Sequence, residues 1–214
     1  MPSLKSRSSR KLMSPKYKIV LLDVDGVLIT PPQLFSRQYF EEYGVDPVQF
    51  FSTQEFQDSS LGKFDLKEAL RLHDDIWKWR GNVDELLRKW FECENYPNEP
   101  LLDVVKRLRS SGTQVYLATQ QEKYRKSYLE EVIFKDKVDG IFCSCDIGYG
   151  KHDNHFWEAV LYEIKKIDSD IEPADIVYFD DKQSLVDLAR DHGIATFLYE
   201  NPDHVQNEVF AQSL

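Results

Sequence analysis

Five short apolar segments recur along the chain, at residues 18–24, 114–118, 140–145, 176–179 and 195–198. None shows the polar alternation of a half-exposed strand, so we expect strands that are buried on both faces. Between most of them the apolar residues repeat at helical spacing, over 101–108, 122–134, 154–167 and 183–192. Strands that alternate with helices predict an α/β fold, a doubly wound parallel sheet with helices on both faces.

The segment from residue 31 to residue 97 interrupts this alternation. It contains no convincing strand, and its pattern predicts helices over 33–43, 65–79 and 83–94. Because it follows the first strand directly, we expect it to form an α-helical cap over the strand ends. The predicted parts are therefore a disordered basic tail (1–17), an α/β core (18–30 and 98–214) and the cap insertion (31–97).

Composition and charge narrow the range of partners. The chain has 214 residues, 42% of them hydrophobic, which suits one globular domain with an insertion. Its net charge is −10, and residues 1–18 hold six basic residues and no acidic one. The rest is strongly acidic and would repel nucleic acids and anionic membranes, so we expect neither as a partner.

The cysteine content and the short apolar runs point to a cytoplasmic location. Three cysteines are too few for a disulfide framework, which favours a reducing compartment. The apolar run at residues 19–22 is four residues long, whereas a membrane helix needs about 20. The basic, serine-rich tail leaves an organellar transit peptide as the alternative to a disordered terminus.

Two carboxylates lie at the end of the first predicted strand, in the sequence Asp23-Val24-Asp25-Gly26. Side chains alternate along a strand, so Asp23 and Asp25 should leave on the same side. A nucleophile and an acid working as a pair need such an arrangement, and Gly26 permits a tight turn after them.

Further polar residues follow the later strands: Thr119 after the second, Lys151 after the third, and Asp180 and Asp181 after the fourth. The carboxyl ends of parallel strands share one edge of a sheet, where ligands bind. Four carboxylates at close range repel one another, so the site is incomplete without a cation. Oxygen ligands of this kind suit Mg²⁺.

This order of motifs resembles the haloacid dehalogenase superfamily of phosphotransferases, over about residues 18 to 198. The resemblance implies that Asp23 is the nucleophile that takes up the phosphoryl group as an aspartyl-phosphate. Asp25 would protonate the leaving oxygen and then deprotonate the attacking water. Mg²⁺ would be held by Asp181 and Asp180, beside Asp23 and the carbonyl group of Asp25. The helical insertion is similar to the small α-helical cap of this superfamily.

The resemblance also implies a phosphate site. Thr119 and Lys151 would contact the phosphoryl oxygens, and the neighbouring Gly26 and Gln120 are expected to line the site. Gln120 stands where the superfamily commonly has Asn, and this departure leaves the substrate class open.

The function predicted from these residues is Mg²⁺-dependent hydrolysis of a small phosphorylated metabolite by a monomer or a homodimer. A phosphomutase would use the same residues, and a non-catalytic binding protein on this fold is the alternative from another class. Dehalogenation is disfavoured, because the dehalogenating members lack an acid at the position of Asp25.

Overall fold

The computed structural model describes residues 14–210, and its centre is one parallel sheet of five strands in the order β3-β2-β1-β4-β5. The strands are β1 (Ile19–Leu22), β2 (Gln114–Thr119), β3 (Gly140–Cys143), β4 (Ile176–Asp180) and β5 (Ala195–Leu198). β1 pairs with β2 on one side and with β4 on the other. The predicted α/β fold with a doubly wound parallel sheet is confirmed.

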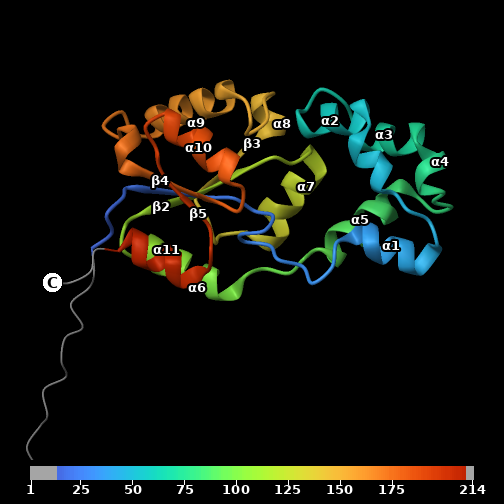
Figure 1. The fold of residues 1–214 in the computed structure, drawn as a ribbon, viewed down its shortest axis with the longest axis horizontal. Helices are drawn as coiled ribbons and strands as arrows, with labels where there is room; N and C mark the ends of the chain where they lie inside the picture. The colour runs from blue at the N-terminus through green and yellow to red at the C-terminus, as the bar shows by residue number, and fades with distance from the viewer. Residues whose placement is uncertain (1–13, 211–214) are drawn as a thin grey trace, which may run out of the picture.

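Helices cover both faces of the sheet (Figure 1). One face carries α9 (Asn154–Ile167) and α10 (Gln183–Asp191), and the other carries α6 (Glu99–Ser110) and α11 (Pro202–Val209). The sheet therefore has water on neither face. This explains why β1 is apolar at every position, and why the polar residues of β2 and β4 other than tyrosine are confined to the strand ends.

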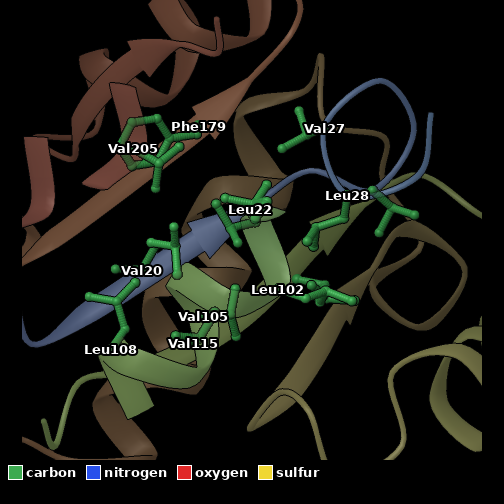
Figure 2. Close-up of a cluster of buried hydrophobic side chains, with 14 of the residues drawn as sticks. Val20, Leu22, Val27, Leu28, Leu102, Val105, Leu108, Val115, Phe179 and Val205 are labelled. Carbon is green, nitrogen blue, oxygen red and sulfur yellow. The ribbon is translucent and has the colours of Figure 1, made fainter. Parts of the chain in front are cut away.

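Alternate residues of β1 supply two separate hydrophobic clusters. Val20 and Leu22 pack with α6 and α11, as Figure 2 shows, whereas Ile19 and Leu21 pack with α9 and α10. All four residues are fully buried, and each contributes roughly 1.5–3 kcal/mol of burial free energy. This packing holds the end of β1, and the residues after it, in one place.

A helical unit is inserted between β1 and α6, and in Figure 1 it gathers at one end of the molecule. It consists of α1 (Phe35–Tyr43), a 3₁₀ turn (Val48–Ser52), α2 (Gln54–Ser60), α3 (Leu66–Leu72), α4 (Asp74–Trp77) and α5 (Val83–Cys93). Aromatic side chains dominate its own hydrophobic cluster, among them Phe35, Phe50 and Trp77. The unit thus has a core separate from those of the sheet.

The two chain segments that connect this unit to the sheet lie side by side. The amide of Thr30 donates to the carbonyl of Tyr96 (3.0 Å), and the amide of Asn98 donates to the carbonyl of Leu28 (2.8 Å). Away from these connections, Asp65 of the helical unit accepts hydrogen bonds from Lys123 (2.6 Å) and Tyr124 (2.8 Å) in α7 (Lys123–Tyr128). The helical unit is therefore attached to the core at these connections and also through contacts with α7.

Several predicted boundaries were wrong. The first strand ends at Leu22 rather than residue 24, and the third ends at Cys143, because Ser144 begins α8 (Ser144–Ile147). The two edge strands are only partly buried, since each has a neighbour on one side alone.

The helix predictions also needed correction. The helix expected over 65–79 is two helices that meet at His73, and the one expected over 122–134 continues past Tyr128 as a π-helical turn (Leu129–Ile133). Helices α2 and α11 were not predicted. Of the predicted tail, residues 1–13 lie outside the described part, while Lys16 donates its amide to the carbonyl of Val209 (2.8 Å). Within residues 14–210, no helix has the length and apolar character to cross a membrane.

Candidate active site

Three of the predicted site residues come together at the carboxyl end of the sheet. Asp23 directly follows β1 and is held there by its amide, which donates to the carbonyl of Phe179 in β4 (3.0 Å). Asp180 is the last residue of β4, and Thr119 is the last residue of β2. All three are buried, so the ends of three adjacent strands place two carboxylates and one hydroxyl close to one another.

Lys151 lies between two of these carboxylates. Its Nζ is 2.6 Å from Oδ1 of Asp23 and 2.7 Å from Oδ2 of Asp180, and it also donates to the hydroxyl of Tyr178 (3.3 Å). The backbone at Lys151 is anchored by the indole of Trp157, whose Nε1 donates to the Lys151 carbonyl (3.0 Å). A buried ammonium is stable only with such partners, because its desolvation is costly.

The pKa values of these groups reflect the shortage of positive charge. Burial alone would lower the pKa of Lys151, but its ion pairs with Asp23 and Asp180 raise it above the ordinary value. Burial raises the pKa of Asp23 to about 7, since the opposing attraction of Lys151 is offset in part by repulsion from Asp180 and Asp25. Lys151 therefore outweighs the effect of burial at Asp180, whose pKa is lowered, but not at Asp23.

A metal ion fits this arrangement. Oxygen atoms of Asp23, Asp180 and Asp181 lie within 4.8 Å of one another, the first two residues being buried and Asp181 exposed. Burial and the neighbouring Asp180 raise the pKa of Asp181. Carboxylate oxygens in this number, with an excess of negative charge, are the ligands that Mg²⁺ prefers. The Asp25 carboxylate is not part of this group.

Asp25 points into a different environment from Asp23. Because β1 ends at Leu22, both aspartates lie in the loop and not on the strand, so the alternation expected for a strand does not apply to them. The Val24 carbonyl accepts the amides of Leu28 (2.9 Å) and Ile29 (2.8 Å), which closes a tight turn. Asp25 is exposed on this turn and lines a cavity of about 400 Å³ between the core and the helical unit.

Gly26 has a conformational role that the sequence indicated only in part. Its φ is +86°, and a Cβ atom at this position would collide with the carboxylate of Asp181. Its amide donates to the carbonyl of Ile29 (2.9 Å). Gly26 thus lets the turn approach Asp181 closely, while its contact with phosphate stays a prediction.

In the loop after β2, Gln120 was expected to line the phosphate site, but it is the side chain of Gln121 that contacts Asp25 and Thr119. Gln120 lines the cavity. The Nε2 of Gln121 donates to Oδ2 of Asp25 (2.7 Å) and to Oγ1 of Thr119 (3.3 Å). Its amide donates to Oγ of Ser144 (3.1 Å). A glutamine in a polar loop carries no signal that sequence reasoning could use.

Tyr178 was also missed, although a signal for it existed. Its hydroxyl donates to Oδ2 of Asp180 and is buried beside Lys151. Residues 178 and 180 of one strand face the same side, so the period of two places Tyr178 next to Asp180.

Comparisons with known proteins identify a family. A sequence model of the family described as "Hydrolase: haloacid dehalogenase-like hydrolase" matches residues 17–193. No curated protein matches the sequence.

Solved structures share the fold at low sequence identity. The HAD family enzyme Bt-2542 from Bacteroides thetaiotaomicron, a magnesium complex, has a TM-score of 0.73 and 17% identity, covering 90% of this chain and 99% of that one. A predicted HAD-like family hydrolase from Porphyromonas gingivalis has a TM-score of 0.67 and 16% identity, covering 89% and 97%. CbbY from Rhodobacter sphaeroides, in complex with xylulose-(1,5)bisphosphate, has a TM-score of 0.52 and 18% identity, covering 85% of each chain.

Proposed function

The chain belongs to the haloacid dehalogenase-like hydrolases, and on that premise we propose that it hydrolyses a small phosphomonoester through an aspartyl-phosphate at Asp23, with Mg²⁺ as cofactor. Asp25 serves as the acid and then the base of this reaction. Thr119 and Lys151 contact the phosphoryl oxygens.

The observation that carries the proposal is the different placement of Asp23 and Asp25. Asp23 is 4% exposed and belongs to the group of three carboxylates, next to Lys151. Asp25 lies outside that group, in the cavity wall. A nucleophile needs to meet the phosphorus atom beside the neutralising charges, whereas an acid needs to meet the leaving group. The two positions match these two needs.

In the first half of the reaction, a carboxylate oxygen of Asp23 forms a bond to phosphorus while the bond from phosphorus to the ester oxygen breaks. The proton of Asp25 passes to the departing oxygen, so the alcohol leaves as a neutral molecule. Lys151 and the hydroxyl of Thr119 stabilise the negative charge on the phosphoryl oxygens, which is the main requirement of phosphoryl transfer.

In the second half, the ionised Asp25 takes a proton from a water molecule as that water attacks the phosphorus of the aspartyl-phosphate. The bond between phosphorus and Asp23 breaks, inorganic phosphate is released, and both carboxyl groups return to their starting states. Splitting the hydrolysis into two steps lowers the barrier of each.

Mg²⁺ would be held by Asp23, Asp180 and Asp181, where it supplies positive charge that Lys151 alone does not provide. Bt-2542 was solved as a magnesium complex, and also with magnesium and inorganic phosphate. These complexes support the same cofactor and product here.

The cavity supports a small substrate. About 400 Å³ accommodates a metabolite-sized leaving group, and the helical unit above it leaves little room for a folded phosphoprotein.

Turnover of 4-nitrophenyl phosphate tests the proposal. We expect release of phosphate that EDTA abolishes and Mg²⁺ restores, and that Ca²⁺ does not restore, because Ca²⁺ takes more ligands at longer distances. Acid quenching during turnover of a ³²P-labelled substrate should leave label on the protein, and borohydride reduction should convert Asp23 to homoserine. Full activity in excess EDTA, or a protein that never carries label during rapid turnover, would contradict the proposal. Formation of a phosphate isomer without free phosphate would identify a phosphomutase instead.

A further inference from the structure

The cavity beside Asp25 has predominantly apolar, aromatic walls. Its lining includes Phe51 from the 3₁₀ turn, Phe56 from α2, and Trp90 and Phe91 from α5. The rings of Phe56 and Trp90 are nearly parallel, at 26°, with centroids 6.5 Å apart. Such walls favour a leaving group with an apolar or planar body over one covered with hydroxyl groups.

Two carboxyl groups of the wall, Glu94 and Glu122, already have protein partners. Glu94 accepts the amide of Phe35 (2.8 Å) and the indole Nε1 of Trp90 (3.1 Å). Glu122 caps α7 by accepting the amides of Tyr124 (2.7 Å) and Arg125. Burial raises the pKa of both groups, that of Glu122 to about 7. The local structure therefore accounts for both side chains without a ligand.

Arg125 differs from them, and among residues 14–210 it is the one cationic side chain that lines this cavity. The residue is 4% exposed, and its Nη1 donates to the carbonyl of Phe91 (3.3 Å). Its Nη2 is buried and has no hydrogen-bond partner among residues 14–210. No carboxylate oxygen of residues 14–210 lies within 4.0 Å of its guanidinium nitrogen atoms. From a longer distance its charge acts on Glu94 and Glu122, where it lowers the pKa and so opposes the effect of burial.

A guanidinium in this state is costly to the folded protein. Arginine remains protonated in proteins, and a buried charge without a close ion pair loses hydration that Glu94 and Glu122 restore only in part from their longer distance. The rings of Phe91 and Tyr128, whose centroids are 5.4 and 5.9 Å from its Cζ, offset part of this loss. An anion entering the cavity would offset more, and two parallel hydrogen bonds to a carboxylate are the geometry that arginine favours.

We propose that Arg125 selects a substrate whose leaving group joins an apolar or planar body to a second anionic group, of which a carboxylate is the simplest. This inference rests on the proposed phosphatase function, since it names the substrate class of the same site. The phosphoryl group lies among Asp23, Thr119 and Lys151, and the second anionic group pairs with the guanidinium at the wall of the cavity.

Phenyl phosphate and the three carboxyphenyl phosphates form a matched set of probes. They share the ring and the reacting group, and they differ in the presence and position of one carboxylate. We expect at least one carboxyphenyl phosphate to have a kcat/KM about tenfold or more above that of phenyl phosphate, the range of a charge-assisted hydrogen bond. Glucose 6-phosphate, which is hydroxylated and has no second anion, should be a poorer substrate than phenyl phosphate and the preferred carboxyphenyl phosphate.

Variants of Arg125 then assign the preference. The quantity to compare is the kcat/KM for the preferred carboxyphenyl phosphate divided by the kcat/KM for phenyl phosphate. In Arg125→Met this ratio should fall to about one. In Arg125→Lys it should fall part of the way, because the charge remains without the planar fork. Arg88→Met is the matched control: this arginine lies on α5 with Trp90, its side chain is 64% exposed, and its change should leave the ratio as it was.

Each result separates the two proposals. If none of the phosphates is hydrolysed, the proposed function fails. If phenyl phosphate is hydrolysed and no carboxylate is preferred, only the role of Arg125 fails, and this comparison needs no variant to fold. If Arg125→Met lowers kcat/KM for both substrates by the same factor, the arginine is a structural counter-ion of Glu94 and Glu122, and the inference is overturned.

Discussion

The side-chain amide of Gln121 donates a hydrogen bond of 2.7 Å to Oδ2 of Asp25, from a residue 96 positions further along the chain. The same nitrogen contacts Oγ1 of Thr119. Gln121 is itself held by Ser144, whose Oγ also donates to the carbonyl of Ser60 in α2 (2.6 Å). The orientation of Asp25 thus depends on a loop that is linked to the helical unit.

Replacement of Gln121 by Ala should weaken acid catalysis more than it weakens binding. Without the amide, the Asp25 carboxyl group loses a hydrogen bond worth about 1.5–3 kcal/mol, so kcat for an alkyl phosphate should fall about 10–100-fold with a smaller change in KM. With 4-nitrophenyl phosphate the loss should be smaller, because nitrophenolate leaves without protonation. Gln114→Ala, at the far end of β2, is the control. Equal losses for both substrates would show that Gln121 does not act through Asp25.

Asp23→Asn and Asp25→Asn should separate the two carboxylates. The first change should abolish turnover, because an amide is a poor nucleophile and a poor metal ligand. The second should lower kcat for alkyl phosphates by about 10²–10⁴-fold and should affect 4-nitrophenyl phosphate less. Rates on both substrates are compared with circular dichroism and thermal melting of each variant. An Asp23→Asn protein with wild-type activity would rule out the covalent mechanism.

Gly26→Ala should damage the metal site as well as the turn. A methyl group at φ +86° is strained by about 1–2 kcal/mol, and here it would also displace the carboxylate of Asp181. Gly112→Ala is a close control, since this residue has φ +90° and its added Cβ meets no atom of residues 14–210 within 4 Å. Both variants should melt at a lower temperature than the wild type, but only Gly26→Ala should need a higher Mg²⁺ concentration for half-maximal activity. An unchanged Mg²⁺ requirement would show that Asp181 adjusts without cost.

Acid should weaken the contact between the helical unit and the core at Asp65. Partial burial would raise the pKa of this carboxyl group, but hydrogen bonds from Lys123 and Tyr124 outweigh that effect and lower it from 3.8 to about 2. The folded state therefore holds this proton less tightly than the unfolded chain. The stabilisation is complete above about pH 4 and is lost as the pH falls from about 4 to about 2. It amounts to roughly 1–2 kcal/mol, because the side chain is partly exposed.

Urea unfolding at pH 5 and at pH 3 measures this effect. Asp65→Asn should have a smaller difference in unfolding free energy between the two pH values than the wild type. Asp46→Asn, a change of the same charge at an exposed position of the helical unit, is the control. If the free energy of unfolding falls by the same amount between pH 5 and pH 3 in Asp65→Asn and in the wild type, the ion pair with Lys123 contributes nothing measurable to stability.

The sequence by itself determined the class of fold and the edge of the sheet at which the site lies. Parallel strands that are buried on both faces are mostly apolar, so β1, β2 and β4 were visible from the local pattern. Chain direction then places Asp23, Thr119 and Asp180 at one edge of the sheet. The cluster of carboxylates from Asp23, Asp180 and Asp181 was predictable for the same reason. No distant contact is needed to deduce it.

Only the tertiary structure distinguished the surroundings of the two carboxylates. Asp23 and Asp25 are the same residue type in one short motif. Asp23 lies in the group of three carboxylates and Asp25 in the cavity wall, and this difference depends on where β1 ends and how the next turn packs. The contact of Gln121 with Asp25 and that of Arg125 with the Phe91 carbonyl both join segments that are far apart in the chain. Local periodicity carries no information about such contacts, because they are set by the packing of helices and loops against one another.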